Sequence, residues 1–109
     1  MDVGGKINAQ LVTNGNMAST IVTSPVNLEK LSSLSFQVTF SGSPNGSMLL
    51  QSSNNGSTWT SITNTIRTIT AAGDIMYPIA EFDVHYIRVA WVPTSGSGTM
   101  NVYAFGSGE

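Results

Sequence analysis

Hydrophobic and polar residues alternate strictly along several short stretches of this chain. In the clearest stretch, residues 34–40, Leu34, Phe36, Val38 and Phe40 alternate with polar residues. Successive side chains of a β-strand point to opposite faces, so this pattern predicts a strand with one buried and one polar face. A shift of one residue would expose all four hydrophobic side chains, and we therefore expect all four in the core.

Further short strands are predicted in the same way, with few helix-forming residues between them. We expect strands at residues 7–12, 18–22, 34–40, 47–52, 59–63, 66–70, 75–82, 86–91 and 100–105, and at most one helical turn at 27–31. Turn-forming residues separate these strands at 14–16, 43–46 and 72–74, and residues 94–99 are predicted to form a long hairpin loop. Turn signals about every 8–12 residues are typical of a sandwich or a barrel.

These elements predict an all-β fold, an antiparallel β-sandwich of the jelly-roll kind, with an immunoglobulin-like sandwich as the alternative. We expect a single domain over residues 1–109, because this length is close to the commonest domain size. Cysteine is absent, which excludes disulfides and thiolate metal sites. No run of about 18 apolar residues is present, so no membrane insertion is expected.

Charge is scarce: only 9% of residues are charged, against about 25% in an average domain. The four basic residues are scattered and the net charge is −2, which argues against a nucleic-acid partner. A surface with few charges tends to associate, so we expect a homo-oligomer, a trimer first and a dimer second. Met17, Met76 and Met100 lack an obvious core position and are expected at such contacts.

The sequence contains no recognisable catalytic or cofactor motif. His85 is the only histidine, and with Glu81 and Asp83 it offers too few ligands for a typical metal site. These residues are interpreted as a corner between strands. Asp74, Glu81 and Asp83 are the only acids that could pair for glycoside hydrolysis, and no Gly-x-Ser-x-Gly elbow or phosphate-binding loop is present. We therefore expect no enzymatic activity, no cofactor and no metal.

Aromatic side chains are the remaining candidates for binding, because they stack on sugars and bury large areas at interfaces. Most of them fall on alternating strand positions, so core packing is expected for the majority. Tyr86 and Phe105 belong to this group, and the residues kept as candidate glycan or interface aromatics are Trp59, Tyr77, Trp91 and Tyr103.

The segment from Ser52 to Trp59 resembles the Asp-box hairpin, Ser-x-Asp-x-Gly-x-Thr-Trp, of sialidases and other β-proteins, with Asn54 at the Asp position. The resemblance implies a structural turn rather than an activity. In such a hairpin the short polar side chain ties the turn and Gly56 supplies a positive φ. Trp59 then packs in the core, and a sugar-binding platform is the alternative.

From Leu28 to Phe105 the layout resembles that of small β-sandwich virion proteins encoded by tailed bacteriophages and prophages. The segments that carry the resemblance are 34–40, 46–59, 86–91 and 96–103. The resemblance implies a non-enzymatic structural protein of the virion, either a capsid decoration protein or a tail, baseplate or fibre component, with other virion proteins as partners. A carbohydrate-binding or receptor-binding module that recognises a host-surface glycan is the alternative.

Overall fold

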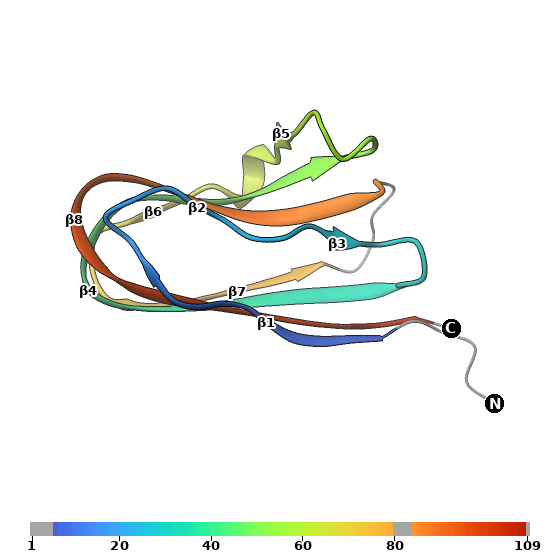
Figure 1. Cartoon of the computed structure of the whole chain (residues 1–109), viewed down its shortest axis with the longest axis horizontal. Helices are drawn as coiled ribbons and strands as arrows, with labels where there is room; N and C mark the ends of the chain where they lie inside the picture. The colour runs from blue at the N-terminus through green and yellow to red at the C-terminus, as the bar shows by residue number, and fades with distance from the viewer. Residues whose placement is uncertain (1–5, 80–83, 109) are drawn as a thin grey trace.

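Two long strands organise the fold. The computed structural model describes residues 6–79 and 84–108, and within them β4 (Ser33–Ser53) and β8 (Tyr86–Ser107) pair antiparallel along their whole length. Both strands bend near their middle, so the pair turns from one layer of a sandwich into the other (Figure 1). Each long strand therefore contributes one half to the lower layer of Figure 1 and one half to the upper layer.

The remaining strands extend the two layers on either side of this bent pair. In the lower layer, β1 (Lys6–Asn16) pairs with the second half of β8, and β7 (Gly73–Ile79) pairs with the first half of β4. In the upper layer, the first half of β8 pairs with β2 (Ile21–Val22) and β3 (Val26–Asn27). The second half of β4 pairs there with β5 (Thr60–Ser61) and β6 (Arg67–Ile69), and the 3-10 turn η1 (Thr63–Thr65) lies between these two strands.

This order is that of an antiparallel jelly-roll-like sandwich, as predicted. The lower layer reads β1–β8–β4–β7, and in the upper layer β2 and β3 flank β8 while β5 and β6 flank β4. An immunoglobulin-like sandwich would place its first two strands side by side in one sheet. Here β1 and β2 both pair with β8, but in different layers, which excludes that alternative.

The prediction of turns at 43–46 and 94–99 was wrong. Both segments lie within continuous strands and face each other across the bend, with Pro44 opposite Gly96. Glycine permits this because Gly42 and Gly96 adopt φ values of +87° and +81°. A Cβ atom on Gly96 would lie 2.1 Å from the Ser43 carbonyl oxygen, so the paired strands approach closely only without a side chain there. A register shift between Asn45 and Gly46 adds to the bend.

The hairpin expected around residues 14–16 is also absent, because β1 and β2 pair with β8 instead of with each other. The predicted strands at 59–63 and 66–70 are reduced to the short β5 and β6. Residues 28–31 form a turn, with the Leu31 N–H donating to the Leu28 carbonyl (3.1 Å). β7 ends at Ile79, and residues 80–82 of the predicted strand lie outside the described residues. Within the described residues, no helix has the length and apolar character needed to cross a membrane.

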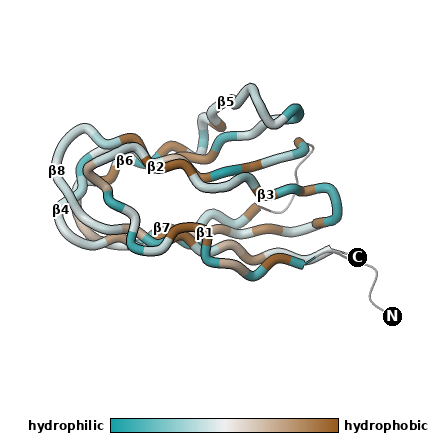
Figure 2. The backbone as a smooth tube through the Cα atoms, in the orientation of Figure 1, coloured by the Kyte–Doolittle hydropathy of each residue, from teal (hydrophilic) through white to brown (hydrophobic). Residues whose placement is uncertain are grey.

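The core lies between the layers. Leu34, Phe36, Val38 and Phe40 are all buried, which confirms the prediction made from their alternation. Figure 2 shows hydrophobic residues recurring along the strands of both layers, with hydrophilic residues at the turn between β3 and β4. The expectation for the methionines was wrong for two of three: side chains from both layers enclose Met17 and Met100 completely, whereas Met76 is 53% exposed.

Candidate binding surfaces

Two of the four candidate aromatics lie in the core, so these two are not available for a glycan or an interface. Trp91 has no exposed surface, and its Nε1–H donates to the Met17 carbonyl (2.9 Å). Tyr77 is also buried, and its hydroxyl lies within hydrogen-bonding distance of the carbonyls of Met48 (3.2 Å) and Thr65 (2.9 Å). Burial raises the pKa of Tyr77 to about 12. Both side chains have their polar atoms satisfied inside the protein, so they are structural.

Trp59 lies on the outer face of the upper layer and is half-buried, which corrects the expectation that it belongs to the core. The guanidinium carbon of Arg88 lies 4.0 Å from the centroid of its ring, within the range of a cation–π contact. The Nε–H of Arg88 donates to Oε1 of Gln51 (2.8 Å), and the Tyr86 ring lies 6.4 Å from Trp59. Desolvation lowers the pKa of Arg88, which stays charged at neutral pH. We call Trp59, Arg88, Gln51 and Tyr86 the Trp59 cluster.

Side chains tie the polar turn that precedes Trp59. Ser53 Oγ accepts from the Gly56 N–H (2.9 Å), and Asn55 Oδ1 accepts from the backbone N–H groups of Ser57 (2.8 Å) and Thr58 (2.9 Å). Gly56 has a φ of +77°, as such a turn requires. The residue that ties the turn is thus Asn55, and the resemblance to the Asp-box stays a prediction.

Asn54 and His85 connect this turn to the start of β8. Asn54 Oδ1 accepts from the backbone N–H of His85 (2.8 Å), so Asn54 links two segments instead of closing its own turn. The exposed His85 ring stacks on Tyr86 with a centroid distance of 4.3 Å. Glu81 and Asp83, which the sequence places near His85, lie outside the described residues. Among residues 6–79 and 84–108, no three histidine or carboxylate side chains gather in one place.

A broad surface of uncharged polar and exposed apolar side chains covers the outer face of the lower layer. The register of the strands places two rows of outward side chains across all four strands, namely Gln10–Tyr103–Gln37–Met76 and Asn8–Phe105–Ser35–Pro78. A third row contains Asn101, Thr39 and Asp74, and Lys6 lies on β1 at the opposite end. We call this surface, from Lys6 to Asp74, the amide face.

The amide face combines ordered amides with exposed apolar side chains. The Gln10 Nε2–H donates to Asn101 Oδ1 (3.0 Å), which also accepts from the Asn14 backbone N–H (2.9 Å). Phe105 is 60% exposed, Met76 53% and Tyr103 40%. The described side chains that point outward here include two charged residues, and both lie at its margin. Such a surface suits a protein or sugar partner better than a charged ligand.

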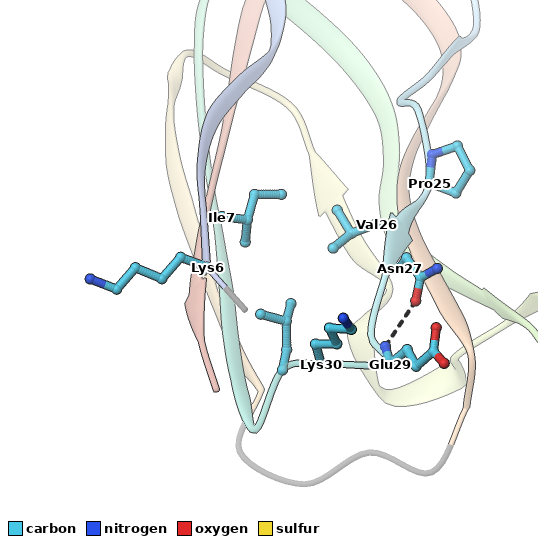
Figure 3. Close-up of a pocket in the computed structure, with 8 residues that line it drawn as sticks. Lys6, Ile7, Pro25, Val26, Asn27, Glu29 and Lys30 are labelled. Carbon is cyan, nitrogen blue, oxygen red and sulfur yellow. Dashed lines mark hydrogen bonds between the residues drawn. The ribbon is translucent and has the colours of Figure 1, made fainter. Parts of the chain in front are cut away.

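A hollow of about 380 Å³ lies at the open edge of the sandwich, between β1 and the β3 region (Figure 3). Ile7 and Val26 point into the hollow from the two layers, and Lys6 points away from it. Glu29 and Lys30 line its rim, and the Glu29 backbone N–H donates to Asn27 Oδ1 (2.8 Å). Pro25 and Leu31 add to its apolar part, so the hollow combines apolar walls with a charged rim.

The sequence contained only part of the information that defines these surfaces. Period-two alternation alone places Ser35 and Gln37 on one outer face, and aromatic content drew attention to Tyr103 and Phe105. No local pattern marks Lys6, Gln10, Gln51 and Arg88 as surface partners, because strand register between distant segments brings them to their neighbours.

The fold is shared with proteins of phage and viral origin, although no protein-family model and no curated protein sequence matches the chain. The SPBc2 prophage-derived protein YomS is similar with a TM-score of 0.59 and 10% identity, over 96% of each chain. The PBSX exported protein XepA gives a TM-score of 0.66 and 10% identity, over 92% of this chain and 36% of XepA. A chain in the structure of infectious bursal disease virus Gx strain gives a TM-score of 0.58 and 14% sequence identity, over 98% of this chain and 32% of that chain.

The chain therefore spans nearly the whole of YomS but only about a third of the other two chains. At these identities the likeness defines the fold and no residue of a site. The class that the geometry defines is a jelly-roll-like β-sandwich of the kind found in prophage-derived and viral proteins.

Proposed function

We propose that this chain is a non-enzymatic structural protein of a bacteriophage virion, a capsid decoration protein or a tail or fibre component, that self-associates. Support for the phage origin comes from the resemblance of its strands to those of phage virion proteins and from the fold it shares with YomS and XepA. Support for a structural role comes from its surface, on which exposed aromatic and apolar side chains lie among uncharged polar ones.

The amide face is the observation that carries the proposal. It exposes Phe105, Met76 and Tyr103 on a domain in which only 9% of residues are charged. Charges normally keep such apolar side chains from associating, and here the centre of the face has none among the described residues. A protein that works inside an assembly has this surface covered by its neighbours.

The test is to locate the protein on particles. Virions purified from the strain that encodes the chain are examined by mass spectrometry and by immunogold electron microscopy with antibodies against it. We expect the protein in the particle fraction, with label on either the head or the tail, which also decides between the two locations. Its absence from purified particles would contradict the proposal.

A carbohydrate- or receptor-binding module is the second candidate, and the Trp59 cluster favours it. Arg88 is held over one face of the indole by its hydrogen bond to Gln51, so a cation and an aromatic ring stand together at the surface. Aromatic faces stack on sugar rings, and a fixed guanidinium binds carboxylates of acidic sugars. A glycan array with the wild-type chain and with Trp59→Ala tests this candidate. Binding that survives Trp59→Ala, or no binding at all, would contradict it.

A further inference from the structure

The two charged side chains of the amide face lie at diagonally opposite corners and have opposite signs. Lys6 is on the edge strand β1, in the row of Ser107, and Asp74 is on the other edge strand β7, in the row of Asn101. Both side chains are exposed. Three strand spacings separate them across the sheet, about 14 Å, and six residues along it, about 20 Å.

This arrangement is self-complementary. A two-fold axis that lies in the plane of contact, perpendicular to the line from Lys6 to Asp74, exchanges the two corners. When two copies face each other about such an axis, Lys6 of each copy meets Asp74 of the other. The strands of the two sheets then cross at roughly 70°, nearer to the orthogonal than to the aligned class of sheet packing.

The same axis passes over the apolar centre of the face. On the central strands β8 and β4, Tyr103 and Ser35 lie nearest to it, with Phe105 and Gln37 on its two sides. The Tyr103 and Phe105 rings are exposed in the single chain. In the pair, Tyr103 lies beside its symmetry mate, and Phe105 packs against the Gln37 side chain of the other copy. The Ser35 hydroxyl and the Gln37 amide are polar groups available for hydrogen bonds across the contact, as is usual at protein interfaces.

We propose that two copies of this chain pair through their amide faces about a two-fold axis, with reciprocal contacts between Lys6 and Asp74. The inference rests on the self-association in the proposed function and names its surface and symmetry. A second copy is the occupant because the face offers equal and opposite charges in positions that its own symmetry mate matches. An isologous contact of this kind closes on itself and gives a dimer, not the trimer expected first from composition.

The size of the face sets the expected affinity. With side chains extending beyond the outer strands, its footprint is about 19 by 24 Å, or roughly 500 Å² per copy after allowing for surface relief. About 1,000 Å² in total is at the lower limit for a specific interface. We therefore expect a dissociation constant in the micromolar range for the free protein.

Charge reversal tests the pairing. The full chain, Lys6→Glu, Asp74→Lys and the double variant Lys6→Glu/Asp74→Lys are compared by sedimentation equilibrium from about 1 to 500 µM at low salt. Each single reversal replaces two attractive contacts of the dimer by two repulsive ones, and we expect dimerisation to weaken about tenfold or more. The double variant restores both attractions and should regain the wild-type constant to within about threefold. Circular dichroism and thermal unfolding verify that each variant is folded.

Matched controls separate the face from a general effect of charge or hydrophobicity. Lys30→Glu makes the same charge change in the β3–β4 turn, away from the face, and should leave the dimer unchanged. Phe105→Ser should weaken it, whereas Val92→Ser, also on β8 but on the other layer and 48% exposed, should not.

Three outcomes would overturn the pairing. A dimer or trimer that all the reversals leave unchanged refutes this surface and leaves the proposed self-association standing. A double variant that stays as weak as the single ones refutes the reciprocal charge contact. A protein that is monomeric throughout this range refutes the pairing and the self-association together, while the particle-labelling experiment still decides the virion role.

Discussion

The bend in the two long strands predicts that Gly96 cannot be replaced by alanine without a large loss of stability. Gly96 adopts a φ of +81°, and a Cβ atom there would lie 2.1 Å from the carbonyl oxygen of Ser43 on the paired strand. Replacing Gly96 by alanine imposes a left-handed conformation on a residue with a side chain, at a cost of about 1–2 kcal/mol. It also forces the paired strands apart, and the loss of one or two ladder hydrogen bonds adds about 1–2 kcal/mol.

We therefore expect Gly96→Ala to lower the free energy of unfolding by about 2–4 kcal/mol, a large part of the roughly 5–15 kcal/mol that stabilises a typical domain. At roughly 4 °C per kcal/mol for a domain of this size, the melting temperature should fall by about 8–16 °C. Urea denaturation and thermal unfolding followed by circular dichroism measure both quantities. If residues 94–99 formed a flexible hairpin loop, the same substitution would be neutral or would stabilise the protein by up to about 1 kcal/mol.

Three other glycines separate the two costs. Gly73 has neither a positive φ nor a close neighbour, since its Cβ would lie 3.7 Å from Phe40, and Gly73→Ala should change stability by less than about 0.5 kcal/mol. Gly56 has a φ of +77°, and a Cβ atom there would make only an ordinary contact with the Tyr86 ring at 3.6 Å, so Gly56→Ala reports the conformational cost alone. A Cβ atom added to Gly98 would clash with the Ser41 carbonyl oxygen, and Gly98 has no positive φ, so Gly98→Ala reports the cost of the close approach alone. A Gly96→Ala variant as stable as Gly73→Ala would refute the bent-strand reasoning.

Three further predictions follow from buried and exposed side chains. The pKa of Tyr77 is about 12 in the folded chain and about 10 when unfolded, so the stability it provides is complete below pH 10 and is lost as pH rises to 12. Urea denaturation between pH 9 and 12 should show the free energy of unfolding fall by up to about 2–3 kcal/mol, and Tyr77→Phe should remove this pH dependence. An unchanged pH dependence in that variant would show that Tyr77 is not its source. Met17→Ser should destabilise the protein by about 3–5 kcal/mol in thermal unfolding and Met76→Ser by less than about 0.5 kcal/mol, because only Met17 is buried. Equal effects would show that the two side chains do not differ in burial. His85→Ala should leave stability and self-association unchanged within about 1 kcal/mol in sedimentation and unfolding assays. Loss of a bound metal in that variant, detected by elemental analysis, would contradict this expectation and support a metal site at His85.

The candidate surfaces depend on contacts between segments far apart in the chain. The Arg88–Trp59 stack joins β8 to the segment before β5, and the corners of the amide face join β1 to β7. No local pattern contains this information, because it follows from which strands become neighbours and in which register. The aromatic residues were visible in the sequence, but their burial was not: Trp91 and Tyr103 both lie in strands predicted from the sequence, yet one is enclosed and the other is exposed.

The sequence by itself determined the strand character and the inward face of the clearest strand. Period-two alternation from Leu34 to Phe40 is a local property of the backbone, so it predicted the burial of those four side chains without any tertiary information. It also determined the class of fold, because short β-rich segments without helices can bury their faces only against another sheet.

Only the tertiary structure decided that the turn-like residues at 43–46 and 94–99 lie within strands. Gly42, Gly96 and Gly98 suit a loop and a tight strand bend equally well, since both need positive φ or space for close backbone approach. The choice was made by pairing: β4 and β8 satisfy each other's backbone hydrogen bonds along their full length, so continuing through the bend leaves fewer polar groups unpaired than two separate loops would. That bend determines which strands are neighbours, and therefore which side chains share the outer faces.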